Sequence, residues 1–215
     1  MGPILLALAL LAAPASAPKP HGGIIAILPL GDRLPKADIS LVEEALVRFY
    51  GLPVRILPRV PLPKSAYYAP RRRYRAEKLL AYLESVRPPD ALQILGLTGA
   101  DISTTKGKHV DWGVLGLASI DGTVGVISRY RAKRRSKGDQ HTRERLAKIA
   151  VHEIGHTLGL DHCPTLGCLM EDAQGSVLTS DREYDLCPRC RARLAAWGKV
   201  IPATVDPPWP KVSRP

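Results

Sequence analysis

The sequence predicts an α/β fold in which a mixed, twisted sheet of about five strands is packed with helices. Short apolar runs of strand length alternate along the chain with amphipathic helical segments, which is typical of crossover-connected sheets. Hydrophobic residues make up 45% of the 215 residues, enough for one substantial core. Beyond Gly159 the composition changes to glycine, proline, cysteine and acidic residues, which indicates a smaller second lobe. We therefore expect an upper subdomain at 18–159, a lower subdomain at 160–200 and an extended tail at 201–215.

The first predicted elements are a strand at Ile24–Leu30 and a helix at 37–50. The strand is a continuous apolar run bounded by glycine and proline. The helix has apolar residues at helical spacing between Asp38, a candidate cap, and Gly51. A short strand follows at 54–57.

The second predicted helix spans 72–86, where leucines at helical spacing mark an inner side and the pair Pro88–Pro89 ends it. Two apolar runs, at 91–98 and 112–119, are expected to be strands. An Asp-Gly turn signal then predicts that residues 123–128 return as an antiparallel strand.

The third predicted helix spans 142–158 and repeats apolar residues along one face. The charged segment before it, 131–138, has no hydrophobic periodicity, so we expect a mobile surface loop. A last helix is expected at 186–197, and the proline-rich end of the chain is expected to be extended.

The N-terminus resembles an export signal. Residues 1–17 contain an apolar stretch that ends at Ala-Ser-Ala, a pattern that signal peptidase accepts, and the stretch is too short to span a bilayer. We expect a protein that begins at Pro18 and is periplasmic or secreted, or cytoplasmic if this segment is not a signal. No other segment predicts stable membrane insertion.

The third predicted helix contains residues that could bind a metal ion. His152 and His156 are four residues apart, so both imidazoles project from one patch and can bind one cation. Glu153 points beside this patch and can reach a metal-bound water without binding the metal. Gly159 can end the helix in a left-handed conformation, which turns His162 back toward the same ion.

Three neutral imidazoles leave one position of a zinc ion open, which is typical of a catalytic zinc. Zinc lowers the pKa of a bound water, and Glu153 can then take its proton as the water attacks a carbonyl. The motif therefore predicts a zinc-dependent hydrolase of amides, with Glu153 as general base and acid.

The run HEIGHTLGLDH, followed by Met170, resembles the metzincin clan of zinc metallopeptidases, and the cysteines resemble those of the archaemetzincins. The cysteines are Cys163, Cys168, Cys187 and Cys190. The resemblance extends upstream to 95–103 and 113–131. It implies a metzincin-like fold, a turn at Met170 beneath the metal, a peptide or protein substrate, and aminopeptidase or endopeptidase activity. It also implies that residues 123–128 are an edge strand above the cleft, where an extended peptide could bind by strand addition.

The four cysteines have two readings. Their spacing supplies two chelating pairs of the kind that hold a closed zinc site, and the resemblance implies a structural zinc, hence two zinc ions per chain. In an exported protein the same cysteines could instead form two disulfides. Met170 likewise has a plain alternative as a core residue.

Composition suggests rival functions. The formal charge of +11 favours acidic partners, so one alternative is a zinc-binding module with little protease activity that recognises an acidic partner. A nucleic-acid-binding zinc protein is a further rival. Aromatic residues make up only 5% of the chain, which supplies few stacking surfaces, and we expect no nucleic-acid partner. We expect a monomer.

Overall fold

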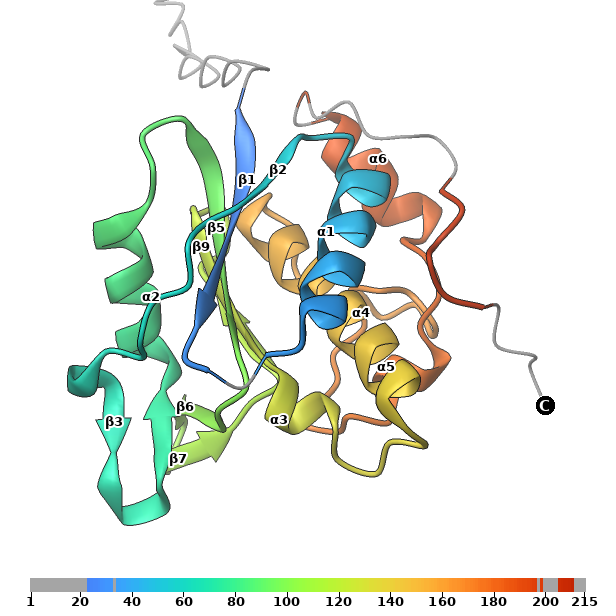
Figure 1. Ribbon diagram of the computed structural model, residues 1–215. Coiled ribbons are helices and arrows are strands. Elements are labelled where there is room, and N and C mark those ends of the chain that lie inside the picture. Colours follow the sequence, from blue (N-terminus) through green and yellow to red (C-terminus); the bar gives the residue numbers. More distant parts are fainter. Residues whose placement is uncertain (1–22, 33, 197, 199–204, 211–215) are drawn as a thin grey trace, which may run out of the picture.

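The computed structural model describes residues 23–32, 34–196, 198 and 205–210 (Figure 1). Its centre is a five-stranded mixed sheet in the order β2-β1-β5-β9-β8. The strands are β1 (Ile24–Leu30), β2 (Val54–Ile56), β5 (Ala91–Thr98), β8 (Gly116–Ala118) and β9 (Val124–Ser128). The first four strands of this order are parallel to one another, whereas β8 runs antiparallel to β9. The predicted α/β fold with a mixed sheet of about five strands is confirmed.

Helices cover both faces of this sheet (Figure 1). The helices are α1 (Lys36–Tyr50), α2 (Ala76–Val86), α3 (Arg129–Ala132), α4 (Asp139–Thr157), α5 (Thr179–Arg182) and α6 (Pro188–Ala196). One core packs the sheet against α1 and α4, and a second packs the other face against α2. Because strands such as β1 are buried on both faces, they are continuous apolar runs rather than alternating ones.

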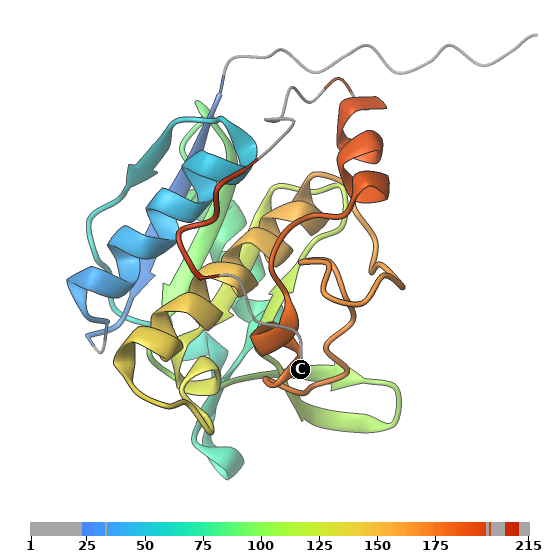
Figure 2. The ribbon, with the colours of Figure 1, turned by 90° about the vertical axis from the view of Figure 1, so that its right-hand side faces the viewer.

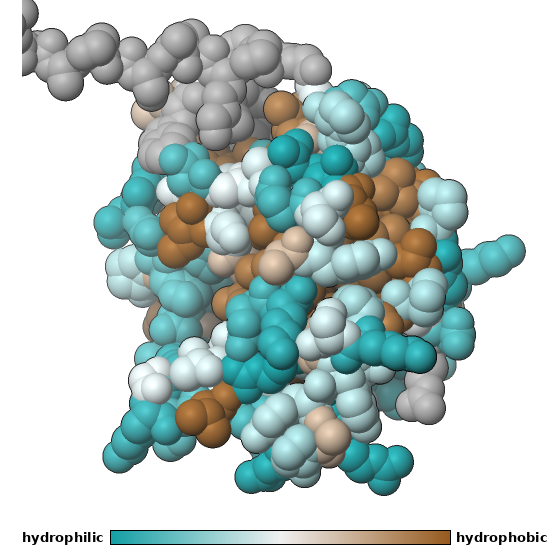
Figure 3. Space-filling model, turned by 90° about the vertical axis from the view of Figure 1, so that its left-hand side faces the viewer, coloured by the Kyte–Doolittle hydropathy of each residue, from teal (hydrophilic) through white to brown (hydrophobic). Residues whose placement is uncertain are grey.

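Residues 161–196 lie on the side of α4 opposite α1 in Figure 2. This arrangement places α4 between the sheet core and the cysteine-containing segment. On the opposite side of the molecule, the face that carries α2 is hydrophilic with apolar side chains scattered across it (Figure 3). No helix among the described residues is long and apolar enough to cross a membrane.

A second sheet of four short strands was not predicted. It has the order β3-β4-β6-β7 and is built from β3 (Tyr67–Tyr68), β4 (Arg73–Arg75), β6 (Ile102–Lys106) and β7 (His109–Gly113). Two single-turn 3-10 helices, η1 (Lys64–Ala66) and η2 (Ala69–Arg71), flank β3. These strands are short and polar, so their hydrophobic pattern gives no strand signal.

The predicted helix at 72–86 is wrong at its beginning. Residues Arg73–Arg75 form β4, whose Tyr74 pairs with Tyr67 on one side and with Ile102 on the other. The helix begins only at Ala76. The leucines that predict the helix start at Leu79, so residues 72–75 carry no helical pattern and the sheet pairing determines their conformation.

The predicted strand at 112–119 is two strands in two sheets. Its first residues belong to β7, and its last belong to β8. The chain changes sheets at the intervening pair, because the Val114 amide donates to Ile102 of β6 while the Leu115 carbonyl accepts from Ser128 of β9. Periodicity cannot detect such a switch, since the apolar pattern continues through it.

Residues 123–128 form the antiparallel partner of β8, as predicted, but they are not an edge strand. β9 is hydrogen-bonded to β5 on one side and to β8 on the other. The edge of the main sheet next to β9 is β8, and the opposite edge is β2. The prediction that residues 123–128 form an edge strand is therefore wrong. The edge strand on this side is Gly116–Ala118.

The remaining boundaries differ less. The helix predicted at 142–158 begins earlier, at Asp139, and the last helix covers Pro188–Ala196. The expected loop at 131–138 begins inside α3, and Arg145 Nη1 of α4 donates to the carbonyls of Ala132 and Arg134 there. This part of the segment is thus helical and anchored to α4.

The predicted export signal at 1–17 lies outside the described residues, and so does most of the tail. Residues 205–210 of the tail form no helix or strand. Trp209 packs back on the body, where its ring stacks on Phe49 at 5.4 Å and its Nε1 donates to the Tyr184 carbonyl. This end of the tail is therefore part of the main core.

Candidate active site

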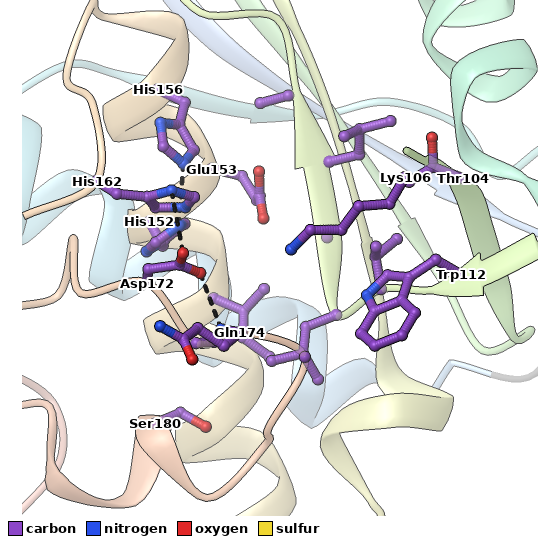
Figure 4. A pocket seen from close by; sticks show the side chains of 18 of the residues that line it. Thr104, Lys106, Trp112, His152, Glu153, His156, His162, Asp172, Gln174 and Ser180 are labelled. Carbon is purple, nitrogen blue, oxygen red and sulfur yellow. Dashed lines mark hydrogen bonds and ion pairs between the residues drawn. The ribbon is translucent and has the colours of Figure 1, made fainter. Parts of the chain in front are cut away.

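The three predicted histidines lie together in what we call the histidine cluster: His152, His156 and His162 (Figure 4). The first two project from adjacent turns of α4, and their Nε2 atoms are 3.0 Å apart. One ring nitrogen from each of the three histidines lies within 4.8 Å of the others. The spacing in the sequence thus produces a set of three imidazoles that can bind one ion.

Gly159 brings the third histidine back to the helix, as predicted. Its φ of 89° is left-handed, a conformation that glycine adopts without steric cost. Its amide donates to His156 O, and the Leu160 amide donates to Gly155 O, which closes the end of α4.

Two backbone carbonyls orient the histidines on α4. Nδ1 of His152 lies 2.7 Å from Leu169 O, and Nδ1 of His156 lies 2.7 Å from Leu160 O. A carbonyl only accepts, so each Nδ1 carries the proton and each Nε2 has a free lone pair. Burial lowers the pKa of His152 to about 3 and lowers the pKa of His156 as well. Both imidazoles are therefore neutral, as metal binding requires.

Glu153 is buried between α4 and the edge strand β8. Burial raises its pKa to about 8, and its side chain packs directly on Gly116. A Cβ at position 116 would lie 2.3 Å from Glu153 Oε1, so only glycine leaves room for this carboxyl group. Sequence reasoning missed Gly116, although a glycine inside an apolar strand is a known sign of close approach.

Met170 lies beneath α4 at the level of the histidine cluster. It is fully buried, and a Cβ at Gly155 would lie 2.5 Å from its Sδ. The preceding carbonyl, Leu169 O, is the partner of His152. Met170 is therefore both a core residue and part of the turn that supports the cluster.

The four cysteines form a separate, enclosed group, the cysteine cluster: Cys163, Cys168, Cys187 and Cys190. All four are free, and the Sγ pairs 163–187 and 168–190 are 3.6 and 3.7 Å apart. Disulfide sulfurs lie at about 2.05 Å, whereas two thiolates on one tetrahedral zinc, with bonds of about 2.3 Å, lie about 3.8 Å apart. The spacing fits a closed zinc site and does not fit two disulfides.

Backbone amides surround these sulfurs. The amides of Met170 and Cys187 lie 3.5 and 3.4 Å from Cys168 Sγ, and the Thr165 amide lies 3.5 Å from Cys163 Sγ. A hydrogen bond with the Cys190 thiol lowers the pKa of Cys168 to about 7. Such amides stabilise thiolates, the form in which cysteine binds metal. The sequence gives no sign of them.

A cavity of about 370 Å³ opens in front of the histidine cluster. Figure 4 shows Lys106 and Trp112 of the β6–β7 hairpin across this cavity from Glu153. The edge of β8 and the segment from Asp172 to Glu183 form the remaining walls. Three imidazoles facing an accessible cavity fit a zinc with an open position, and four enclosed thiols fit a zinc without one.

Comparison with known proteins identifies the family of the chain. The model of peptidase family M54 matches residues 36–196. The archaemetzincin of Archaeoglobus fulgidus is 32% identical over 157 residues, which cover 73% of this chain and 90% of the relative. That of Haloquadratum walsbyi is 29% identical over 178 residues, 80% of this chain and 99% of the relative.

Solved structures give the same result. The crystal structure of archaemetzincin from Methanopyrus kandleri aligns with a TM-score of 0.72 at 31% identity and covers 84% of this chain and 99% of that chain. The archaemetzincin of Archaeoglobus fulgidus complexed with malonate aligns with a TM-score of 0.67 at 32% identity, covering 79% and 98%. The chain therefore belongs to peptidase family M54, the archaemetzincins, and is a zinc metallopeptidase.

Proposed function

We propose that the histidine cluster holds the catalytic zinc, that Glu153 is the general base and acid of peptide hydrolysis, and that the cysteine cluster holds a second, structural zinc. The observation that carries this proposal is the position of Glu153. Its carboxyl group lies beside the cluster and against the strand that borders the cavity, and it is not one of the three grouped ligands. A purely structural metal site has no use for such a group.

Zinc bound at the histidine cluster would supply a Lewis acid that polarises the scissile carbonyl and activates water. The chain's own residues perform the proton transfers. Glu153 takes a proton from the attacking water and returns it to the amine that leaves. Gly116 keeps the carboxyl group close to β8, and the carbonyls of Leu169 and Leu160 hold the two helical imidazoles in one tautomer.

The substrate binds as an extended strand along β8 in this proposal. β8 is an edge of the main sheet, and its three residues, together with Leu115, line the cavity. An edge strand offers unpaired amides and carbonyls that hold a peptide irrespective of its side chains. This mode of binding favours a chain that continues on both sides of the scissile bond, and hence cleavage within a peptide.

Export through residues 1–17 also remains part of the proposal. The apolar stretch and the Ala-Ser-Ala end support it. Expression of the full chain in an export-competent host, followed by N-terminal sequencing of the exported fraction, should give a protein that begins at Pro18. Recovery of the intact N-terminus in the cytoplasm alone would contradict export.

The decisive variant is Glu153→Gln. We expect it to retain the zinc of wild type and to lose peptide hydrolysis by about 10³-fold, because the amide cannot accept the proton. Glu144→Gln is the matched control, since Glu144 lies on the same helix but outside the cavity, where it accepts a hydrogen bond from Gln140.

Hydrolysis by Glu153→Gln at the wild-type rate would overturn the assigned role of Glu153. If wild type binds zinc at both clusters but cleaves no peptide in a broad library, the alternative of a zinc-binding module gains support instead.

A further inference from the structure

A buried carboxyl group lies in the wall of the substrate cavity and takes no part in the proposed hydrolysis. Glu183 follows α5 directly and is only 4% exposed, yet it lines the same cavity as the histidine cluster. Among the described residues, it makes no side-chain hydrogen bond and no ion pair within 4.0 Å. Buried carboxyl groups are ordinarily paired, so this one is available to a partner that enters the cavity.

The segment that carries Glu183 is held firmly on both sides. Before it, Asp181 accepts two hydrogen bonds from the fully buried Arg145 of α4, at 2.5 and 2.6 Å. After it, the Tyr184 amide donates to Gly167 O at 3.1 Å. Arg182 pairs with Glu171. The backbone that carries Glu183 is therefore held in place at this wall of the cavity.

The charges around Glu183 leave it under-compensated. Burial raises its pKa well above the ordinary value, and the nearby Lys148 opposes this only in part. The Lys148 amine has other partners: it donates a hydrogen bond to Ser180 O at 2.9 Å and lies over the Trp209 ring. A cation that enters the cavity would compensate the carboxylate fully.

The cavity itself is more acidic than basic. Three of its lining side chains are carboxylic acids, Glu153, Asp172 and Glu183, and one is a lysine, Lys106, which lies on the opposite hairpin. The volume of about 370 Å³ extends from the histidines past Ile149 to Glu183. This space suits a long side chain whose end reaches the carboxyl group while its backbone lies along β8.

We propose that Glu183 binds a cationic group of the substrate and makes this peptidase selective for peptides with lysine or arginine beside the scissile bond. The inference rests on the proposed function and adds the substrate class. The same carboxylate could receive the free N-terminal amine of a peptide, so the test must separate the two sources of positive charge.

The test uses zinc-loaded full-length enzyme and a library of N-acetylated peptides, in which side chains are the only cations. We expect lysine and arginine to be enriched at one position next to the cleaved bond. In matched acetylated peptides, replacing that residue with norleucine should lower kcat/KM on the order of tenfold or more, the usual effect of losing a hydrogen bond between charged groups.

Two variants connect the preference to Glu183. In Glu183→Gln the ratio of kcat/KM between lysine and norleucine peptides should fall to near one, while the norleucine peptide is cleaved as by wild type. Glu183→Met is the second variant, should the glutamine fail to fold. Glu144→Gln is the control, since Glu144 also acts electrostatically on Lys148 but lies outside the cavity, and it should keep the full preference.

Three outcomes would overturn the inference. Cleavage without enrichment of basic residues would do so, as would a preference that survives in Glu183→Gln. Faster cleavage of free-amine peptides, with no effect of the side chain and with loss of that advantage in Glu183→Gln, would assign the carboxylate to the N-terminus instead. Failure of the zinc-loaded enzyme to cleave any library peptide would count against the proposed function itself.

Discussion

The two donor clusters lie next to each other in the fold but differ in almost every physical respect. The histidine cluster faces a cavity, and the side chain of His162 is 50% exposed. The cysteine cluster lines no part of that cavity, and three of its four members are buried. An acidic side chain lies beside the histidines, whereas backbone amides surround the sulfurs.

This difference suits the two clusters to different roles: the histidine cluster to catalysis and the cysteine cluster to stabilising the fold. A reactive metal needs an open position and a group that moves protons, and both are present only at the histidine cluster. A structural metal needs enclosure and stabilised thiolates, and these are present at the cysteine cluster. The two clusters nevertheless share one short segment, because Leu169 O orients His152 while the Met170 amide donates to Cys168.

The largest effect should come from breaking the cysteine cluster at that shared segment. We expect Cys168→Ser to lower the free energy of unfolding by several kcal/mol, because the binding energy of a structural zinc is folding energy. Loss of the turn should also misplace Leu169 O and reduce hydrolysis. Thermal unfolding, zinc content and peptidase rate measure the three effects.

Leu166→Ser serves as the control for Cys168→Ser, since Leu166 lies in the same loop and is 75% exposed. A Cys168→Ser protein with the wild-type unfolding temperature and one zinc fewer would contradict a structural role for the cysteine cluster.

The second prediction affects the histidine cluster alone. In Gly116→Ala the new methyl group would overlap Glu153 Oε1, so the carboxyl group must move. We expect hydrolysis to fall by about 10²-fold, which is typical of a misplaced catalytic group. Zinc content and the unfolding temperature should change little, because neither cluster loses a ligand. Unchanged hydrolysis would show that the position of Glu153 against β8 is unimportant.

The grouping of the histidine cluster was predictable from the sequence. The spacing of His152, His156 and His162 on a helix that ends at Gly159 determines their geometry, so local rules are sufficient. The central strands were predictable for the same reason, since burial on both faces leaves a continuous apolar run.

Features that depend on tertiary contacts were not predictable. The carbonyls of Leu169 and Leu160 have no side-chain signature, and the need for glycine at 116 arises only because α4 packs on β8. The change of sheet at Val114 and Leu115 likewise follows from pairing with distant strands. The same reason explains why Glu183 was missed: an isolated glutamate near a cysteine gives no sign of burial in a cavity wall.

The smallest predicted effect concerns the third histidine, which differs from the other two in its support. His162 has a carboxylate near it rather than a carbonyl, since its Nδ1 lies 3.9 Å from Asp172 Oδ2. We expect Asp172→Asn to weaken zinc binding at the histidine cluster by about tenfold, the lower end for an outer partner of a metal ligand. Competition with a zinc chelator measures this affinity. Thiols that stay unreactive during the titration show that the cysteine cluster has kept its zinc.

Asp161→Asn is the matched control for Asp172→Asn, because Asp161 directly precedes His162 but pairs with Arg193 at 2.9 Å. It should leave zinc affinity unchanged. Equal losses in both variants would mean that general negative charge near the site, and not a specific contact with His162, strengthens zinc binding. A loss only in Asp172→Asn would show that His162 is held by an acidic partner, whereas the two histidines on α4 are held by backbone carbonyls.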